Sequence, residues 1–238
     1  IFDLLISSDQ KLWVGTENGG ISILDLKKMM FITPETAVFR NIRYKDNEEG
    51  ISNSTVRCIF EDSFHNIWIG TYGGGVNFIS NIENYFNKWI YSPIPGGVNN
   101  LSNKVAWGIC SDAQDNIWIG TDGGGIDVFE NGINVRNFST GNTILKSNAI
   151  LSAIKDSNNN LWFGTYRGGL YFYDSKKKQF EYINLDNNSQ LYISCLFEDR
   201  SRNLFIGTHN GLFKYNLTSK KIDSYYAGSS SIHENDIR

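Results

Sequence analysis

Short runs of four to six mainly apolar residues alternate along this chain with breaks rich in Asp, Asn, Ser and Gly. In one stretch the runs are Val56–Glu61, Ile67–Gly70, Val76–Ile79 and Asn87–Tyr91. Runs of this length between turn-forming residues predict β-strands, and no stretch combines helical periodicity with helix caps. Because the breaks are short, consecutive strands are expected to pair as antiparallel hairpins. The pattern predicts a unit of four antiparallel strands, called A to D in chain order.

Strand B of this unit occurs five times, as an aromatic residue followed by an apolar residue, Gly and Thr. The aromatic residues lie 43 to 55 residues apart, close to the length of a β-propeller blade. The copies are Leu12–Thr16, Ile67–Thr71, Ile117–Thr121, Leu161–Thr165 and Leu204–Thr208. We therefore expect an all-β fold, a β-propeller of four-stranded antiparallel blades with five repeats present. The expected blades are approximately 1–50, 51–100, 101–144, 145–188 and 189–228.

The two ends of the chain fall at the same phase of the repeat. Counting back from each repeated aromatic residue places Ile1 level with Val56, and Asn235–Arg238 resembles Asn53–Arg57. Residues 229–238 are therefore expected to begin a further blade. Since the chain has no initiator Met, it is interpreted as a segment of a longer protein. We expect a larger propeller, because an open arc would expose apolar blade faces.

The repeated residues of strand B have a structural interpretation. The aromatic residue, Trp68 in the second copy, is expected to pack between neighbouring blades. The adjacent Gly70 is expected to allow close backbone approach, and the hydroxyl of Thr71 to hold the following turn.

Composition excludes several classes of function. The chain is 40% hydrophobic with a net charge of −3, which allows a sizeable core and gives no basic footprint for nucleic acid. No run approaches the roughly 18 apolar residues that span a membrane. Cys58, Cys110 and Cys195 fall on A strands without close pairs or His spacing, so we expect small buried residues rather than disulfides or a metal site. No nucleophile, zinc-protease or phosphate-loop motif is present, so we expect no catalytic residue and no cofactor.

The string Asp-x-x-x-Asn-Ile/Leu-Trp-Ile/Phe-Gly-Thr-x-x-Gly-Gly, preceded by Leu101–Val105 or Ile51–Val56, resembles the two-component-regulator propeller repeat. The resemblance covers essentially the whole chain, although Ser7 replaces Asp in the first copy and Phe205 replaces Trp in the fifth. It implies the periplasmic sensor region of a hybrid two-component system of Bacteroidetes. In that family two seven-bladed propellers and a β-sandwich precede a transmembrane helix, a histidine kinase, a receiver and a DNA-binding domain. By this resemblance the chain is a non-catalytic part of a seven-bladed sensor propeller.

Candidate ligand-binding residues come from one edge of the blades. Strand B ends at the Thr and turns into strand C where the chain enters strand A, so residues at this mouth carry no inter-blade packing and can vary. Tyr, Trp, Arg, Asp and His side chains there can stack on sugar faces and bind sugar hydroxyls. The candidates are Arg57, Tyr72, Trp107, Asp122, Tyr166, Arg167 and His209.

The resemblance implies an oligosaccharide or a polysaccharide breakdown product as the ligand, sensed in order to control glycan-utilisation genes. The expected partners are the rest of the sensor polypeptide and, as an open alternative, a second copy in a homodimer. Nucleic acid is not an expected partner of this segment, and the membrane is reached only through the full-length protein.

Two other functions stay open at this point. A generic protein-binding propeller would present a flat protein surface rather than a polar, aromatic-lined pocket. The stretch Ser111–Trp118 faintly echoes the Asp box of sialidases, but the box lies in a different hairpin and no catalytic arginine triad is recognisable.

The first unit has a longer connection between strands C and D than the others. It runs over Asp25–Val38, against Asp174–Gln179 in the fourth unit. This places Met29–Ile32 in an apolar excursion on the face opposite the mouth, which predicts contact with another domain or subunit.

Overall fold

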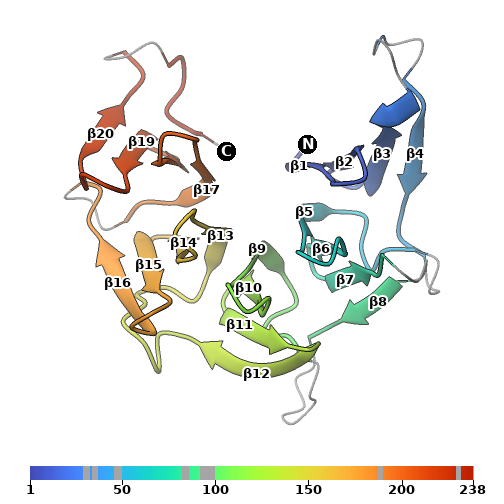
Figure 1. Ribbon diagram of the computed structural model, residues 1–238, viewed down its shortest axis with the longest axis horizontal. Helices are drawn as coiled ribbons and strands as arrows, with labels where there is room; N and C mark the ends of the chain where they lie inside the picture. Colours follow the sequence, from blue (N-terminus) through green and yellow to red (C-terminus); the bar gives the residue numbers. More distant parts are fainter. Residues whose placement is uncertain are drawn as a thin grey trace. The chain divides into compact units, whose positions relative to one another are not determined.

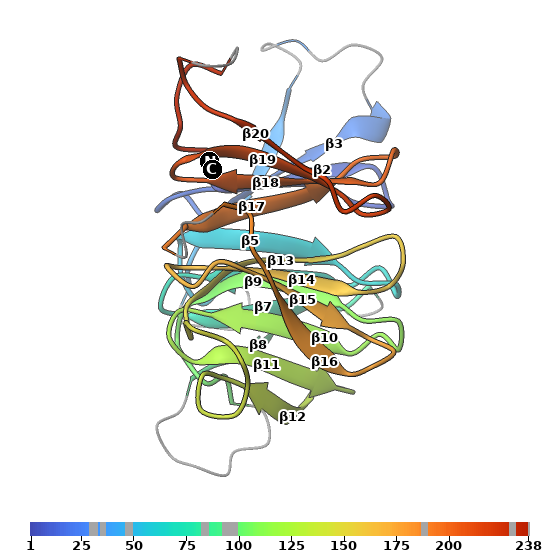
Figure 2. The same cartoon turned by 90° about the vertical axis from the view of Figure 1, so that its left-hand side faces the viewer.

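The structure, a computed structural model, describes residues 1–28, 33, 37–45, 50–81, 86–91, 100–186, 190–228 and 232–237. Its strands form five four-stranded antiparallel sheets, each made of four consecutive strands (Figures 1 and 2). Apart from a 3-10 turn at Leu26–Lys28, the described residues contain no helix. The expected all-β propeller fold with four-stranded blades is confirmed. The chain divides into two compact units, residues 1–109 and 110–238, and each is described by itself.

The first unit contains blades 1 and 2, in which β1 of the first lies beside β5 of the second. Their strands are β1 (Asp3–Ile6), β2 (Lys11–Gly15), β3 (Ile21–Asp25), β4 (Phe39–Ile42), β5 (Val56–Glu61), β6 (Ile67–Thr71), β7 (Gly75–Ile79) and β8 (Phe86–Trp89). β8 ends at Trp89, two residues before the end of the predicted strand D at Asn87–Tyr91. The predicted excursion at Met29–Ile32 lies outside the described residues.

The second unit contains most of blade 3 and all of blades 4 and 5, and the division between the units falls within β9. The A strand of blade 4, β13, lies beside β10 of blade 3 and β17 of blade 5. The strands are β9 (Ala106–Ser111), β10 (Ile117–Thr121), β11 (Gly125–Glu130), β12 (Ile133–Phe138), β13 (Ile150–Lys155), β14 (Leu161–Thr165), β15 (Leu170–Asp174), β16 (Gln179–Ile183), β17 (Ile193–Glu198), β18 (Asn203–Thr208), β19 (Gly211–Asn216) and β20 (Ile222–Tyr225).

The Asp and Trp of the repeated string form one hydrogen-bonded unit around the turn between strands A and B. Asp62 Oδ1 accepts hydrogen bonds from the backbone N–H groups of Phe64 and Asn66, both at 2.9 Å. Its Oδ2 accepts from Trp68 Nε1 at 2.8 Å. The carboxylate therefore shapes the turn and satisfies the buried indole at once. Asp112 and Asp156 do the same in blades 3 and 4.

The two departures from the string are accommodated locally. In blade 1 the hydroxyl of Ser7 accepts the hydrogen bond of Trp13 Nε1 at 3.1 Å. In blade 5 Asp199 still accepts from the turn, at 2.8 Å from the N–H of Asn203, but Phe205 has no indole donor.

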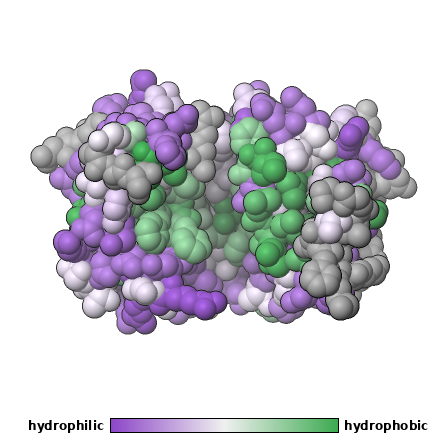
Figure 3. All heavy atoms as spheres, turned by 90° about the horizontal axis from the view of Figure 1, so that it is seen from above, coloured by the Kyte–Doolittle hydropathy of each residue, from purple (hydrophilic) through white to green (hydrophobic). Residues whose placement is uncertain are grey.

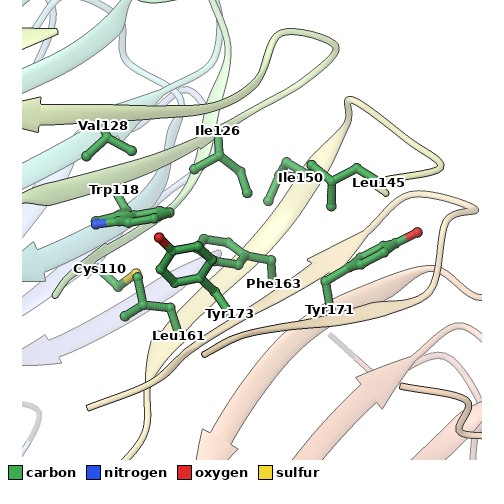
Figure 4. Close-up of a cluster of buried hydrophobic side chains, with 10 residues drawn as sticks. All are labelled: Cys110, Trp118, Ile126, Val128, Leu145, Ile150, Leu161, Phe163, Tyr171 and Tyr173. Carbon is green, nitrogen blue, oxygen red and sulfur yellow. The ribbon is translucent and has the colours of Figure 1, made fainter. Parts of the chain in front are cut away.

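The repeated Trp packs against the next blade, as predicted. Trp118 is 4% exposed, and its ring lies 4.8 Å from that of Tyr173 and 5.9 Å from that of Phe163, both in blade 4. Figure 4 shows these rings together with the aliphatic side chains of the same cluster. Trp162 makes the same contact with Tyr215 of blade 5, at 5.6 Å. Aromatic packing between blades therefore forms the core of the second unit.

The repeated Gly and Thr also behave as predicted. A Cβ atom on Gly120 would lie 2.6 Å from Ile150 Cγ2, at the start of the next A strand, so a larger residue does not fit there. The hydroxyl of Thr121 donates to the carbonyl of Gly125 at 3.0 Å and closes the turn into strand C. The same hydrogen bond recurs in the other four blades.

The residues after blade 5 continue the register of the repeat. Ile237 N donates to Thr208 O at 2.9 Å, as Val56 N donates to Thr16 O at 3.0 Å between blades 1 and 2. Ile237 also lies against Gly207 in the way that Ile150 lies against Gly120.

Candidate functional site

The predicted mouth residues lie at one edge of each blade, named here the B–C edge: the residues that follow the repeated Thr and those that enter strand A. Tyr72 N donates to Thr55 O at 2.9 Å, and Tyr166 N donates to Ala149 O at 2.9 Å. In blade 5 the equivalent hydrogen bond runs from His209 N to Tyr192 O at 3.3 Å. These hydrogen bonds hold the B–C turn beside the entrance to strand A, as the topology predicted.

Arg57, Tyr72 and Trp107 are the candidates in the first unit, and they lie together with Phe2 around the Arg57 guanidinium. Its Cζ lies 3.8 Å from the centroid of the Phe2 ring, 4.6 Å from that of Trp107 and 5.3 Å from that of Tyr72. Phe2, Arg57 and Trp107 occupy the same position of strand A in blades 1, 2 and 3, so the propeller repeat itself brings the three side chains together. We call these four residues the arginine cluster.

Aromatic contact takes the place of ion pairing for Arg57. Burial lowers the pKa of its guanidinium, and the opposing charge of Glu17 offsets part of that effect. Arg57 Nε and Trp107 Nε1 are buried without a hydrogen-bond partner among the described residues. Cation–π contacts stabilise the charge, but ring faces do not supply acceptors for these N–H groups.

Three candidates of the second unit meet around Tyr192, which the sequence analysis did not single out. The Tyr192 ring stacks on that of Tyr166, with centroids 4.3 Å apart, and lies 4.3 Å from that of His209. Arg167 adopts a left-handed backbone with φ of +55°, and its Nε donates to the Tyr192 hydroxyl at 2.9 Å. We call these four residues the tyrosine cluster.

Hydrogen bonds connect the polar tips of the tyrosine cluster. The hydroxyl of Tyr192 donates to that of Tyr166 at 3.1 Å, and Tyr192 N donates to His209 Nδ1 at 3.1 Å. The bond between the two hydroxyls lowers the pKa of Tyr192, with a further contribution from Arg167, and raises the pKa of Tyr166. Tyr166, Arg167 and His209 are exposed, so the cluster presents ring faces and polar groups to solvent.

Asp122 lies close to the tyrosine cluster without belonging to its stack. Its backbone forms an isolated bridge with Ala149, whose carbonyl accepts from Tyr166 N. The negative charge of Asp122 contributes to the raised pKa of Tyr166. The seven candidates therefore divide into two local groups, one in each unit.

The sequence held a usable signal for Tyr192. The equivalent positions, directly before strand A, are Thr55, Val105 and Ala149, so the aromatic ring in blade 5 breaks the pattern of the repeat. The predicted candidates are residues after the Thr and residues early in strand A, and Tyr192 lies at neither position.

The first unit also contains a cavity of about 1050 Å³ between blades 1 and 2, lined in part by Ser7, His65 and Trp13. None of the predicted site residues lines it. Ile79, which lines the cavity, occupies the position of Tyr173 and Tyr215 in later blades. The smaller side chain fills less space beside Trp13 than those tyrosines fill beside the Trp of the preceding blade.

The described residues contain no cluster of three or more His, Cys, Asp or Glu side chains that could hold a metal ion. Within the same residues, no helix has the length and apolar character needed to cross a membrane.

Comparison with protein families identifies the repeat. Residues 50–73, 100–123 and 144–167 match the family described as two component regulator propeller. Each segment runs from the entrance of strand A to the turn after strand B, which is the part that carries the repeated string. The chain therefore carries two-component-regulator propeller repeats, as its sequence predicted.

Solved structures give the relatives of this chain. The extracellular domain assigned to a hybrid two-component system of B. thetaiotaomicron is 43% identical over 99% of this chain and 30% of its own length, with a TM-score of 0.55. A second such domain from the same organism is 22% identical over 97% of this chain and 31% of its own length, with a TM-score of 0.75. The first match establishes homology, whereas the second shows the fold alone. The chain spans less than a third of the length of either domain.

An enzyme is also among the structures with a similar fold. A catalytically inactive variant of virginiamycin B lyase from Staphylococcus aureus, solved with quinupristin, is 15% identical over 94% of this chain and 69% of its own, with a TM-score of 0.66. At this identity the match shows the fold alone and carries no activity over to this chain. None of the curated proteins matches the chain.

Proposed function

We propose that the chain is a non-catalytic, ligand-sensing part of the periplasmic region of a hybrid two-component sensor, and that its ligand is an oligosaccharide. Homology to an extracellular domain of a hybrid two-component system supports the sensing role. In this proposal a histidine kinase elsewhere in the same polypeptide carries the catalysis, and the output is control of glycan-utilisation genes. The rest of that polypeptide and a second copy in a homodimer are the proposed protein partners.

The observation that carries the carbohydrate assignment is the tyrosine cluster. Tyr166 and Tyr192 are nearly parallel, at 18° between ring planes, and Tyr166 is 41% exposed. A ring face with a phenol at its tip can stack on the C–H face of a sugar and bind its hydroxyls. His209 Nδ1 already accepts from Tyr192 N, so His209 Nε2–H and the terminal N–H groups of Arg167 add donors for sugar hydroxyls.

Sensing also requires that the ligand distinguish two states of the protein. A ligand shifts an equilibrium only through its differential affinity for the two states. The tyrosine cluster joins residues 166–167 of blade 4 to residues 192 and 209 of blade 5, so a bound sugar would link two blades of the second unit. We propose that this link is the first step of the signal.

Calorimetric titration of the protein with a panel of oligosaccharides tests the proposal. Tyr192→Ala removes the centre of the stack and is expected to abolish binding, while Tyr192→Phe keeps the ring and is expected to weaken binding about tenfold through the lost hydroxyl. Phe64→Ala, an exposed aromatic residue at the opposite edge of blade 2, is the matched control. If Tyr192→Ala and the wild type bind an oligosaccharide with equal affinity, the tyrosine cluster is not the binding site. Turnover of a glycan by the protein would contradict the non-catalytic assignment.

The protein-binding scaffold is the second candidate, because apolar side chains remain exposed. Ile133 and Val135 on β12, the edge strand of blade 3, are 46% and 52% exposed. Figure 3 shows apolar patches among polar side chains on the face it draws. Exposed apolar patches mark interaction surfaces in many proteins. Under this candidate Val135→Asp is expected to weaken binding of a protein partner, and calorimetric titration of the wild type with oligosaccharides is expected to give no heat.

A further inference from the structure

Two buried donors lie next to each other in the arginine cluster. Arg57 Nε and Trp107 Nε1 are the buried side-chain nitrogen or oxygen atoms for which the described residues offer no partner. The two side chains are in contact, since Arg57 Cζ lies 4.6 Å from the centroid of the Trp107 ring. An N–H group that loses water on folding and gains no acceptor is costly and rare in native proteins. Two of them together at the B–C edge indicate an acceptor that comes from outside the chain.

The charge of Arg57 is also uncompensated by contact. Among the described residues no carboxylate forms an ion pair with it, and Glu17 acts on it only as a nearby charge. Among the described residues the terminal nitrogens of the guanidinium have no partner, and they are not among the buried atoms, so they reach solvent. The rings of Phe2 and Trp107 lie within 5 Å of its Cζ, which leaves the edge with the terminal nitrogens for a ligand.

The arginine of the other cluster provides a contrast. Arg167 Nε donates to the Tyr192 hydroxyl, so that arginine is already engaged in an internal hydrogen bond. Arg57 makes no such bond to any residue that the structure describes, although it sits at the same edge of its blade. A cation held in place by aromatic rings, with its donors free, is prepared to bind an anion.

We propose that Arg57 and Trp107 form a subsite for the anionic group, a carboxylate or a sulfate ester, of an acidic sugar. The forked N–H groups of a guanidinium match two oxygens of such a group, and the indole N–H can donate to a third acceptor. The ring of Tyr72, which is 50% exposed and lies 5.3 Å from Arg57 Cζ, provides a face for the sugar ring. That the anion is carried by a sugar rests on the proposed function; the preference for an anion rests on the donors and the charge.

A neutral sugar satisfies these observations less well. Its hydroxyls could accept from the two N–H groups, but the charge of Arg57 would stay unpaired in a partly desolvated site. An anion supplies the acceptors and the opposite charge together, and charge-assisted hydrogen bonds are the stronger ones.

Calorimetry with four probes tests the subsite: oligogalacturonate, a sulfated disaccharide, a neutral oligosaccharide of matched length, and inorganic sulfate. Arg57→Gln is expected to weaken binding of the acidic probes on the order of 10- to 100-fold and to change the neutral probe little. Binding of the acidic probes to the wild type is expected to weaken with rising salt. Trp107→Phe keeps the ring, removes the indole N–H and is expected to have a smaller effect of the same kind. Arg43→Gln, at an exposed arginine of blade 1, is the control.

The outcomes separate this subsite from the proposed function. If the wild type binds only the neutral oligosaccharide, the anionic subsite is overturned and oligosaccharide sensing stands. If inorganic sulfate binds through Arg57 but no oligosaccharide binds, the subsite stands and the oligosaccharide assignment fails. If circular dichroism shows that Arg57→Gln does not fold, Arg57→Lys decides, because it keeps the charge without the fork and is expected to bind acidic probes several-fold more weakly than wild type. Equal affinity of that variant and the wild type, or binding independent of salt, overturns the subsite.

Discussion

Trp118 Nε1 donates a hydrogen bond to Asp112 Oδ2 at 3.0 Å, which ties β10 to the turn between β9 and β10 of blade 3. Both side chains are buried; the carboxylate is the acceptor for the indole N–H and also accepts from the backbone N–H groups of the turn. The string that identifies the repeat is therefore a hydrogen-bonded structural unit as well as a packing motif.

Replacing Trp118 by Phe is expected to destabilise the protein by about 1–3 kcal/mol, because the buried carboxylate of Asp112 loses a donor. Replacing it by Ala is expected to cost about 3–5 kcal/mol, since the inter-blade contact with Tyr173 is lost as well. Urea denaturation followed by circular dichroism measures both. Phe205→Trp in blade 5 is the reciprocal control and is expected to be neutral or stabilising, because Asp199 would gain the missing donor. A larger loss for Phe than for Ala at position 118 would contradict this assignment of roles.

The glycine beside the repeated aromatic residue predicts a steric effect. A Cβ on Gly164 would lie 2.5 Å from Ile193 Cγ2 in the next A strand, so Gly164→Ala is expected to cost about 1–3 kcal/mol through overpacking. Gly141→Ala is the matched control, because its Cβ would meet nothing nearer than 3.8 Å. Thermal unfolding of the two variants compares them directly. Equal melting temperatures of the two variants would show that blade 5 can move away from Gly164 without loss of stability.

Sequence reasoning reached most of the fold because the repeat places the same residue at the same point of every blade. Five copies of one string predict five B strands, and the turns around them predict the A and C strands. Positions without a repeated residue were harder to predict. The D strand of blade 2 was predicted to end two residues too late, since no residue in Asn87–Tyr91 marks the end of hydrogen bonding.

The repeat predicted the aromatic packing between blades, but it did not predict the polar contacts between them. The hydroxyl and N–H of Ser157 both donate to the carboxylate of Glu198, at 2.6 and 2.7 Å, and join blades 4 and 5. Neither residue stands out in its own repeat. The same holds for the candidate site. The repeat predicted the edge at which Tyr166 and Arg57 lie, but only the structure shows which side chains contact each other there.

The cavity beside Trp13 predicts a stabilising substitution. Ile79→Tyr introduces the residue found at the equivalent position of blades 4 and 5, where it packs against the Trp of the preceding blade. We expect a gain of about 0.5–2 kcal/mol, as for other cavity-filling changes. Tyr173→Ile, the reverse exchange in blade 4, is expected to destabilise. A decrease in the melting temperature of Ile79→Tyr would mean that the cavity cannot accept the ring.

The cysteines predict an order of reactivity. Burial strongly raises the pKa of the Cys58 and Cys110 thiols. Cys195, in β17, is less completely buried, and burial also raises the pKa of its thiol. Since the thiolate is the reactive form, we expect all three to react slowly with a disulfide reagent in the native protein, with Cys195 first. Mass spectrometry of partially labelled protein identifies the site. Labelling of Cys58 at the same rate in the native and urea-unfolded protein would contradict its burial.

The tyrosine cluster predicts an order of ionisation. Because Tyr166 and Arg167 both stabilise its phenolate, Tyr192 has a pKa below the ordinary value of 10, while the pKa of Tyr166 is raised. The native protein therefore releases this proton at a lower pH than the unfolded chain. In that window the unfolded state binds more protons, so the contribution of Tyr192 to stability rises with pH.

Ultraviolet difference titration of wild type against Tyr192→Phe isolates this ionisation. Arg167→Gln removes a hydrogen bond and a positive charge from the phenolate, so the first tyrosine ionisation is expected to move to higher pH. Arg200→Gln, at an exposed arginine outside the cluster, is expected to leave it in place. If Arg167→Gln leaves the titration of Tyr192 unchanged, the contact between Arg167 Nε and the Tyr192 hydroxyl does not persist in solution, and Arg167 would then be free to bind a ligand as Arg57 is.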